Sequence, residues 1–384
     1  MNSFAAFADS QTHDLSVLTG LESLDLATSA AIIGAPLTGK TSALRHIVGR
    51  LEANGAAPSE ILVLTPSRMA AAILRDQIAL DSNQSSESPR ARSVSSVAFE
   101  VLSAKAPIRL LSGAHQQTLL QRLVSDRLTV TKASEWKLSA ESLELEGFVQ
   151  ELRDLLAVII ESGLSEIQLE ELQAEFPKLR LGPAIELLEP YREHLGLDGL
   201  VDSSQLAVAA AAENLAELPH RFLLVDDAHN LSAGQLRLVE ALASDRVLFV
   251  FGDPDVATLG FRNSSSAQFL ELAKHREAIQ IFLEPAGSAS CAKNLMSALS
   301  SRIPASGPVS HRPRPNATAD SVLAMKFDNL IAETDFLAAE LRKSRLTKHI
   351  DWSEMLVVGR TRVQLEQLSR ELSARGMGMP GCMC

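Results

Sequence analysis

Short apolar runs rich in Ile, Val and Leu recur along the chain, and most are followed by a segment with apolar residues at helical spacing. This alternation is typical of a parallel β-sheet covered by helices on both faces, because the buried strands of such sheets are apolar at nearly every position. The pattern therefore predicts an α/β fold. The predicted strands are Ala31–Ile33, Ile61–Thr65, Phe222–Val225, Val247–Phe251 and Met355–Val358.

Residues 98–219 follow a different pattern. Apolar side chains recur there at helical spacing, as from Leu145 to Ile159, and strand-like alternation is scarce. We therefore expect a helical insertion that splits the α/β domain. A stretch rich in Pro, Ser and Gly at 285–320 predicts a linker, and a second α/β unit is expected to begin after it. Its predicted elements are strand-like runs at Val322–Phe327 and Met355–Val358 and helices at about Ile331–Arg345 and Val363–Ala374.

Composition and charge exclude several classes of protein. The chain has 384 residues and 46% hydrophobic residues, enough for two or three domains with buried cores. Its 36 Lys and Arg residues against 47 Asp and Glu residues give a formal charge of -11, so any contact with nucleic acid needs a local surface. Three cysteines are too few for a disulfide framework, and neither a leader peptide nor an apolar run of membrane-spanning length is recognisable. We expect a cytoplasmic protein without membrane contact.

The segment directly after the first predicted strand carries the clearest chemical signal. It fits the phosphate-binding pattern G-x-x-x-x-G-K-[ST] with Gly34, Ala35, Pro36, Leu37, Thr38, Gly39, Lys40 and Thr41. In such a loop backbone N–H groups surround a polyphosphate, Lys40 reaches the β and γ phosphates, and the Thr41 hydroxyl binds Mg²⁺. A helix expected over Ser42–Asn54 places the loop at a helix N-terminus, which favours anions. The pattern indicates binding of ATP with Mg²⁺; an ordinary strand–turn–helix is the alternative.

A pair of carboxylates follows a later predicted strand. Asp226 and Asp227 come directly after Phe222–Val225. Because a phosphate-binding loop needs a second group for the metal, we assign Asp226 to Mg²⁺ together with Thr41. Asp227 is then placed to orient or deprotonate an attacking water, which makes both carboxylates candidate catalytic residues. The alternative is that the two carboxylates simply begin a surface loop.

Five segments, in this order, resemble motifs of UvrD/Rep-type superfamily 1 DNA helicases. They are the phosphate loop at 34–41, the T-P-x-R-A-A-like Thr65–Ala71, the D-E-x-Q-D-like Asp226–Asn230, the G-D-P-D-Q-S-I-Y-x-F-R-like Gly252–Arg262 and the V-L-V-R-T-R-like Met355–Arg362. Within this family we expect the RecB or AdnA/AdnB helicase-nuclease branch. The resemblance covers most of the chain, and the ordered set of motifs carries it.

The resemblance implies a motor that hydrolyses ATP between two RecA-like domains and moves along single-stranded DNA, in DNA repair or recombination. It implies ATP contact by Arg262 and DNA contact by Arg68, Phe99 and Phe261. The alternative for Arg68 is a solvated helix face, and the alternative for Phe261 is a place in the apolar core. The implied protein partner is a second helicase-nuclease subunit.

The resemblance also implies a domain organisation. We expect an N-terminal segment at 1–29, the two parts of RecA-like domain 1A at 30–110 and 220–284, the helical insertion 1B at 111–219, a linker at 285–320, the start of RecA-like domain 2A at 321–376 and an irregular tail at 377–384. Because the pattern stops early in domain 2A, this second domain is expected to be incomplete and the chain to be truncated at its C-terminus.

Several family positions hold other residues in this chain. They are Asp227 for Glu, His229 for Gln, Asn230 for Asp, Val256 for Gln and Leu259 for Tyr. An adenine-reading box before residue 30 and an ATP-contacting Arg within Leu283–Ser288 are not recognisable. Asp is one methylene shorter than Glu, so Asp227 is expected to limit hydrolysis. Two hypotheses follow: an ATP-driven DNA motor, and a catalytically idle nucleotide-binding subunit that holds DNA or a partner.

Overall fold

The computed structural model describes residues 19–82, 90–129, 136, 139–143, 145–197, 199–256, 266–283, 299, 302 and 325–377. The chain divides into two compact units. The α/β unit consists of His13–Gly287 with Arg302–Pro313, and the C-terminal unit consists of Met1–Thr12, Ser288–Ser301 and Arg314–Cys384.

The α/β unit is built on a six-stranded sheet in which all neighbouring strands are parallel. The strand order is β3 (Ala91–Ser93), β2 (Ile61–Thr65), β6 (Phe222–Val225), β7 (Val247–Gly252), β1 (Ala30–Ile33) and β8 (Ile279–Phe282). The predicted α/β class and the four predicted strands of this unit are confirmed. The two edge strands, β3 and β8, were missed because they are short and carry polar Arg92 and Gln280.

The register of the sheet brings functional loops to one edge. Ile33 pairs with Gly252, and Val225 pairs with Leu64 and Val250, so β1, β7, β6 and β2 end almost level. Parallel sheets place ligands beyond the carboxyl ends of their strands. The loops after β1, β6 and β7 therefore meet at the edge where a ligand is expected.

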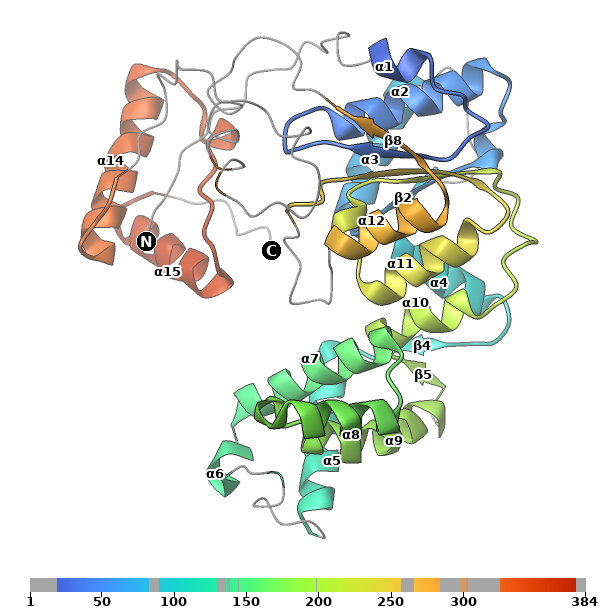
Figure 1. Ribbon diagram of the computed structural model, residues 1–384. Helices are drawn as coiled ribbons and strands as arrows, with labels where there is room; N and C mark the ends of the chain where they lie inside the picture. The colour runs from blue at the N-terminus through green and yellow to red at the C-terminus, as the bar shows by residue number, and fades with distance from the viewer. Residues whose placement is uncertain are drawn as a thin grey trace. The chain divides into compact units, whose positions relative to one another are not determined.

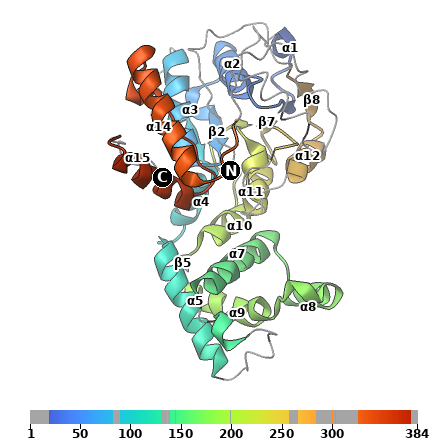
Figure 2. The ribbon, with the colours of Figure 1, turned by 90° about the vertical axis from the view of Figure 1, so that its left-hand side faces the viewer.

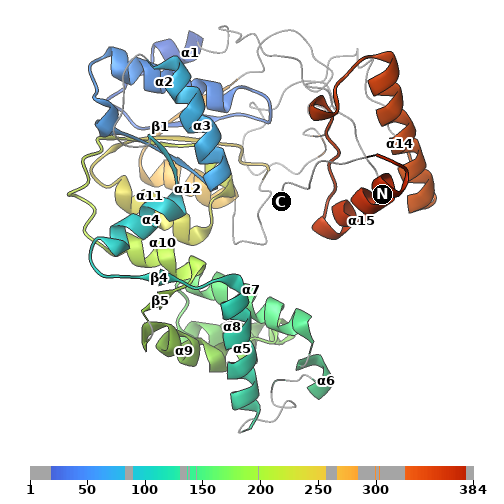
Figure 3. The same ribbon diagram turned by 180° about the vertical axis from the view of Figure 1, so that it is seen from behind.

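Helices cover both faces of the sheet (Figure 1). One face carries α1 (Thr19–Glu22), α2 (Lys40–Ala53) and α3 (Arg68–Asp81); the other carries α4 (Val94–Ser103), α10 (Ser203–Ala211), α11 (Ala233–Leu242) and α12 (Ser266–His275). Figure 3 shows α4, α10 and α11 together on this second face. Successive strand residues alternate between the two cores: Ala30 and Ile32 join one, and Ala31 and Ile33 join the other.

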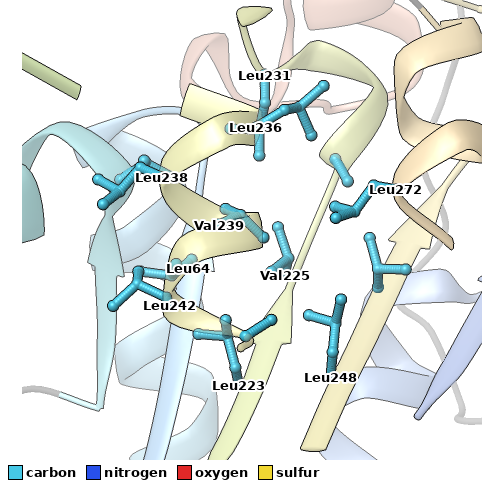
Figure 4. Packing of buried hydrophobic residues seen from close by; sticks show 14 of the residues in the cluster. Leu64, Leu223, Val225, Leu231, Leu236, Leu238, Val239, Leu242, Leu248 and Leu272 are labelled. Carbon is cyan, nitrogen blue, oxygen red and sulfur yellow. The ribbon is translucent and has the colours of Figure 1, made fainter. Parts of the chain in front are cut away.

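The core beneath α11 shows how the sheet is held. Leu223 and Val225 of β6 and Leu248 of β7 lie against Val239 and Leu242 of α11 (Figure 4), and all five side chains are buried. Each such side chain contributes roughly 1.5–3 kcal/mol when it leaves water. Because α11 starts just after Asp226–Asn230, this packing also anchors the loop that carries the carboxylates.

The insertion between β3 and β6 has its own apolar core. Its elements are β4 (Arg109–Leu110), α5 (Gly113–Leu128), α6 (Ala140–Leu143), α7 (Glu146–Ser162), α8 (Glu166–Glu175), the 3₁₀ turn η4 (Pro177–Leu179), α9 (Gly182–Leu197) and β5 (Leu200–Val201). Figure 2 shows α5, α7, α8 and α9 gathered together. The parallel pair β4 and β5 marks where the chain enters and leaves, and it was not predicted. Helix α10 lies within the predicted range 111–219 but packs on the sheet core.

A buried polar network ties the insertion to α10. Tyr191 donates its hydroxyl proton to Asp202 at 2.7 Å and accepts a hydrogen bond from Gln116 at 2.8 Å. The other oxygen of Asp202 caps α10 by accepting from the N–H groups of Ser204 and Gln205 at 2.8 Å each. Since buried polar groups are costly unless they are hydrogen-bonded, this network defines one arrangement of α5, α9 and α10.

The C-terminal unit contributes α14 (Leu330–Thr347), the 3₁₀ turn η8 (Trp352–Glu354) and α15 (Arg362–Ala374), so both predicted helices are confirmed. The predicted strand Met355–Val358 is wrong: these residues form no strand, and Leu356 and Val358 are exposed at 84% and 72%. An apolar run without a neighbouring strand has no ladder to join. Of the predicted run Val322–Phe327, residues 325–327 form no strand, and 322–324 lie outside the described residues.

Several other predictions concern residues that the structure does not describe. These are Leu259, Phe261 and Arg262, residues 1–18, most of the linker 285–320 and residues 378–384. No helix in the described ranges is both long and apolar enough to cross a membrane.

Candidate functional site

The loop at 34–41 joins β1 to α2 through a tight turn. Leu37 and Gly39 have φ angles of 66° and 90°, in the left-handed region. A Cβ on Gly34 would lie 2.2 Å from the Thr38 hydroxyl oxygen, which itself donates to the carbonyl of Ala35 at 2.8 Å. The close approach therefore requires glycine at position 34.

The start of α2 is open to an anion. Gly39 is the N-cap of this helix and has no side chain that could accept from the N–H groups of the first turn. The first N–H groups of a helix have no partner within it and carry the positive end of its dipole. A phosphate group satisfies both, so the backbone here fits a polyphosphate.

The side chain of Lys40 turns back over this loop. Its Nζ donates to the carbonyls of Gly34 at 2.9 Å and Ala35 at 3.1 Å. Burial lowers the pKa of Lys40, while the carboxylates of Asp253, Asp227 and Asp226 act in the opposite direction. The ammonium group thus lies where the loop, the carboxylates and a bound phosphate would meet.

Asp226 and Thr41 are in direct contact although 185 positions separate them in the sequence. The Thr41 hydroxyl donates to Asp226 Oδ2 at 3.0 Å, and the N–H of Asp227 donates to Oδ1 at 3.0 Å. Burial, and then the charge of Asp227, raise the pKa of Asp226 to about 6. A divalent cation between these oxygens would relieve that penalty, so the pair fits Mg²⁺.

No larger set of ligands competes for a metal in the described ranges, where no three His, Cys, Asp or Glu side chains gather as a metal site. Mg²⁺ is commonly held by one or two protein oxygens, with water and phosphate oxygens completing the shell. The hydroxyl and carboxylate of Thr41 and Asp226 match that mode of binding.

Asp227 follows directly in a strained conformation. Its φ and ψ angles of 46° and 41° lie in the left-handed region, and it forms the N-cap of the 3₁₀ turn η5 (Ala228–Asn230). A non-glycine residue there costs of order 1 kcal/mol, and such strain is concentrated at functional sites. This conformation turns the chain away from the direction of β6 directly after Asp226.

His229 is a site residue that sequence reasoning treated only as a departure from the family pattern. Its side chain is buried, Nδ1 accepts a hydrogen bond from the backbone N–H of Asp253 at 3.2 Å, and the amide of Asn230 lies 3.2 Å from Nε2. Burial lowers the pKa of His229; Asp227 and Asp253 oppose this effect and Lys40 adds to it. Its place three residues after Asp226 was the only signal in the sequence.

Two of the predicted DNA contacts lie on helices that cover opposite faces of the sheet. Arg68 is exposed as the first residue of α3, and Phe99 on α4 is half-buried against the sheet core. Phe261 and the predicted ATP contact Arg262 lie outside the described residues.

Comparison with known families identifies a helicase family. The family model described as UvrD/REP helicase N-terminal domain matches residues 21–277. This range contains the phosphate loop, the insertion, both carboxylates and His229, and it covers well over half of the chain. No curated protein matches the sequence.

Proposed function

This chain belongs to the UvrD/REP helicase family, and from that premise we propose that it binds ATP with Mg²⁺ at residues 34–41 and couples ATP hydrolysis to movement along single-stranded DNA. The resemblance to UvrD/Rep-type helicases is thereby confirmed as membership of the family. Placement in the RecB or AdnA/AdnB branch, a role in repair or recombination, a second helicase-nuclease subunit and a cytoplasmic location stay predictions.

The contact between Thr41 and Asp226 is the observation that supports this proposal most strongly. It joins the helix that starts at the phosphate loop to the end of β6, with Lys40 alongside. Two segments so far apart in sequence meet at one sheet edge with the hydroxyl, carboxylate and ammonium groups that phosphoryl transfer uses.

Each residue has a definite part in the proposed reaction. The loop N–H groups and Lys40 hold the phosphates, and Thr41 with Asp226 holds the metal. Mg²⁺ held there would supply positive charge that offsets the negative charge of the phosphates. Asp227 accepts a hydrogen bond from the attacking water and orients it; its shorter side chain reaches less far than Glu would.

The distribution of charge supports DNA contact on the sheet-bearing part of the chain. Residues 111–219 contain 8 Lys and Arg against 19 Asp and Glu, a net charge of -11 (8 - 19) that equals the charge of the entire chain. An insertion of this charge repels phosphate on average. We propose that DNA is held outside it, with Arg68 and Phe99 contributing from helices on the two faces of the sheet and Phe261 as a further contact.

Arg68 is suited to a phosphate contact. It lies at the first position of α3, where the helix dipole disfavours a cation, and it forms no ion pair with any described residue. A DNA phosphate would supply the missing negative charge.

The idle nucleotide-binding subunit is the second candidate function. It is favoured by Asp227, because the carboxylate that orients water is one methylene shorter than in the family. ATP hydrolysis measured with and without single-stranded DNA separates the two candidates: a motor is stimulated by DNA, and an idle subunit binds ATP without turnover.

Titration calorimetry with Mg–ATP tests the nucleotide site itself. Replacing Lys40 by Ala removes the ammonium that lies over the loop, so we expect binding at least roughly tenfold weaker, the usual consequence of losing a charge-assisted contact. Lys105→Ala serves as the matched control, because Lys105 is exposed and pairs with Glu213. Equal affinity for parent and Lys40→Ala would contradict the proposal.

A further inference from the structure

A single peptide unit at the end of β7 is held from both sides. Its carbonyl, that of Gly252, accepts from the N–H of Gly34 at 3.1 Å. Its N–H, that of Asp253, donates to Nδ1 of His229 at 3.2 Å. The first bond leads to the phosphate loop and the second to the loop that carries Asp226 and Asp227.

We propose that His229 is a positioning residue that fixes the metal-binding carboxylate relative to the phosphate loop through the Gly252–Asp253 peptide unit. The inference rests on the proposed function, since it concerns the same site. His229 contacts neither ATP nor metal in this assignment; it acts through the peptide unit.

The geometry of this peptide unit explains how the position of His229 determines that of the phosphate loop. A peptide unit is planar and rigid, so a displacement of its N–H also displaces its carbonyl and the Gly34 N–H bonded to it. Bonds on both ends of one unit polarise each other and strengthen together. The Phe269 ring lies 2.9 Å from where a Cβ of Gly252 would stand, so the unit has little room to shift sideways.

A second connection between the two loops is the Thr41–Asp226 hydrogen bond. When Thr41 and Asp226 both turn their oxygens to a metal, this bond no longer defines their separation. The link through His229 uses neither oxygen, so it persists in the loaded state. It therefore holds the carboxylate in place when the metal site is in use.

The chemistry of position 229 is specific. The side chain must offer an acceptor at the δ position to a buried N–H, and the imidazole does so in its neutral form with the proton on Nε2. The lowered pKa of His229 agrees with a neutral ring. Asn places an oxygen near the same position, whereas Leu fills a similar volume without an acceptor.

The test compares parent, His229→Leu and His229→Asn by ATP titration in Mg²⁺ and in EDTA. The readout is the factor by which Mg²⁺ strengthens ATP binding, because this factor depends on how the metal site and the phosphate loop face each other. Leaving a buried N–H without an acceptor costs a free energy equivalent to about tenfold in an equilibrium constant. We expect the Mg²⁺ factor of His229→Leu to be about tenfold smaller than that of the parent, with ATP affinity in EDTA within about twofold of the parent. The Mg²⁺ factor of His229→Asn should stay within about threefold of the parent value.

His220→Leu is the matched control. His220 is also partly buried, and its Nδ1 has no hydrogen-bond partner among the described residues, so its loss should leave the Mg²⁺ factor unchanged. A His229→Leu protein with the parent's Mg²⁺ factor overturns the inference, as does a His229→Asn protein that loses as much as His229→Leu. A parent that binds no Mg–ATP refutes the proposed function and this inference with it.

Nitrogen NMR of histidine-labelled parent provides a readout that does not depend on nucleotide or on folding of a variant. We expect the His229 ring to be neutral at pH 7 with the proton on Nε2 and Nδ1 free to accept. A ring protonated at Nδ1 overturns the inference.

Discussion

Replacing Asp226 by Asn should make the metal-free protein more stable at neutral pH. Burial and the neighbouring Asp227 raise the pKa of Asp226 from 3.8 to about 6. At about 1.4 kcal/mol per pKa unit, keeping this group ionised costs the folded state about 3 kcal/mol. Asn removes the charge and can still pair with the Thr41 hydroxyl and the Asp227 N–H.

The expected gain in stability from Asp226→Asn increases with pH. Between about pH 4 and pH 6 the folded protein retains a proton on Asp226 that the unfolded chain has released. The stability contributed by this group therefore falls as the pH rises through that window. The advantage of Asp226→Asn should be about 3 kcal/mol at pH 7.5 and below about 1 kcal/mol at pH 4.

Urea unfolding in EDTA at the two pH values measures this effect. Asp202→Asn is the matched control, because Asp202 is also buried but its carboxylate accepts from Tyr191, Ser204 and Gln205. Asn at 202 should destabilise the protein. Mg–ATP should stabilise the parent and have little effect on Asp226→Asn. The reasoning fails if Asp226→Asn is less stable than the parent at pH 7.5, or if its advantage is the same at pH 4.

Two further predictions concern catalysis and stability. Asp227→Glu should raise DNA-stimulated phosphate release and Asp227→Ala should lower it; no gain from Glu would place the limiting step at another residue. Arg246→Leu should lower the free energy of unfolding, measured in urea, by about 3–5 kcal/mol, because removal of the buried guanidinium leaves four carbonyls without donors. These are the carbonyls of Leu215, Leu218, His220 and Leu242. Arg122 is exposed, so Arg122→Leu should change the free energy of unfolding by less than about 1 kcal/mol. An equal loss for both arginine variants would contradict the second prediction.

The interior of the sheet could be predicted because its strands are buried on both faces. β1, β2 and β6 are buried at every position, so each reads as a continuous apolar run. β3 and β8 lie at the edges and mix apolar with polar residues, so the same signal is weak there. The run at 355–358 shows the opposite failure, since an apolar segment alone does not provide a neighbouring strand.

The candidate site, like the sheet, could be predicted only in part. The contact of Thr41 with Asp226 could be predicted because both side chains belong to recognisable motifs whose chemistry requires a shared metal. The link from His229 to the Asp253 N–H could not, because every residue except proline has a backbone donor and the sequence does not reveal which donor is used. Only the register of β6 and β7 brings the two together.

The charges around Lys40 explain why binding of a metal, a phosphate and a proton would be linked at this site. One ammonium group is influenced by three carboxylates, those of Asp253, Asp227 and Asp226. Without a cation the site holds an excess of negative charge in a poorly solvated place, and a proton on Asp226 reduces it, because burial and the charge of Asp227 raise the pKa of this carboxyl group. A divalent cation held by Thr41 and Asp226 would supply two positive charges at the same position and take the place of that proton. The raised pKa of Asp226 and the proposed binding of Mg²⁺ therefore have one physical cause.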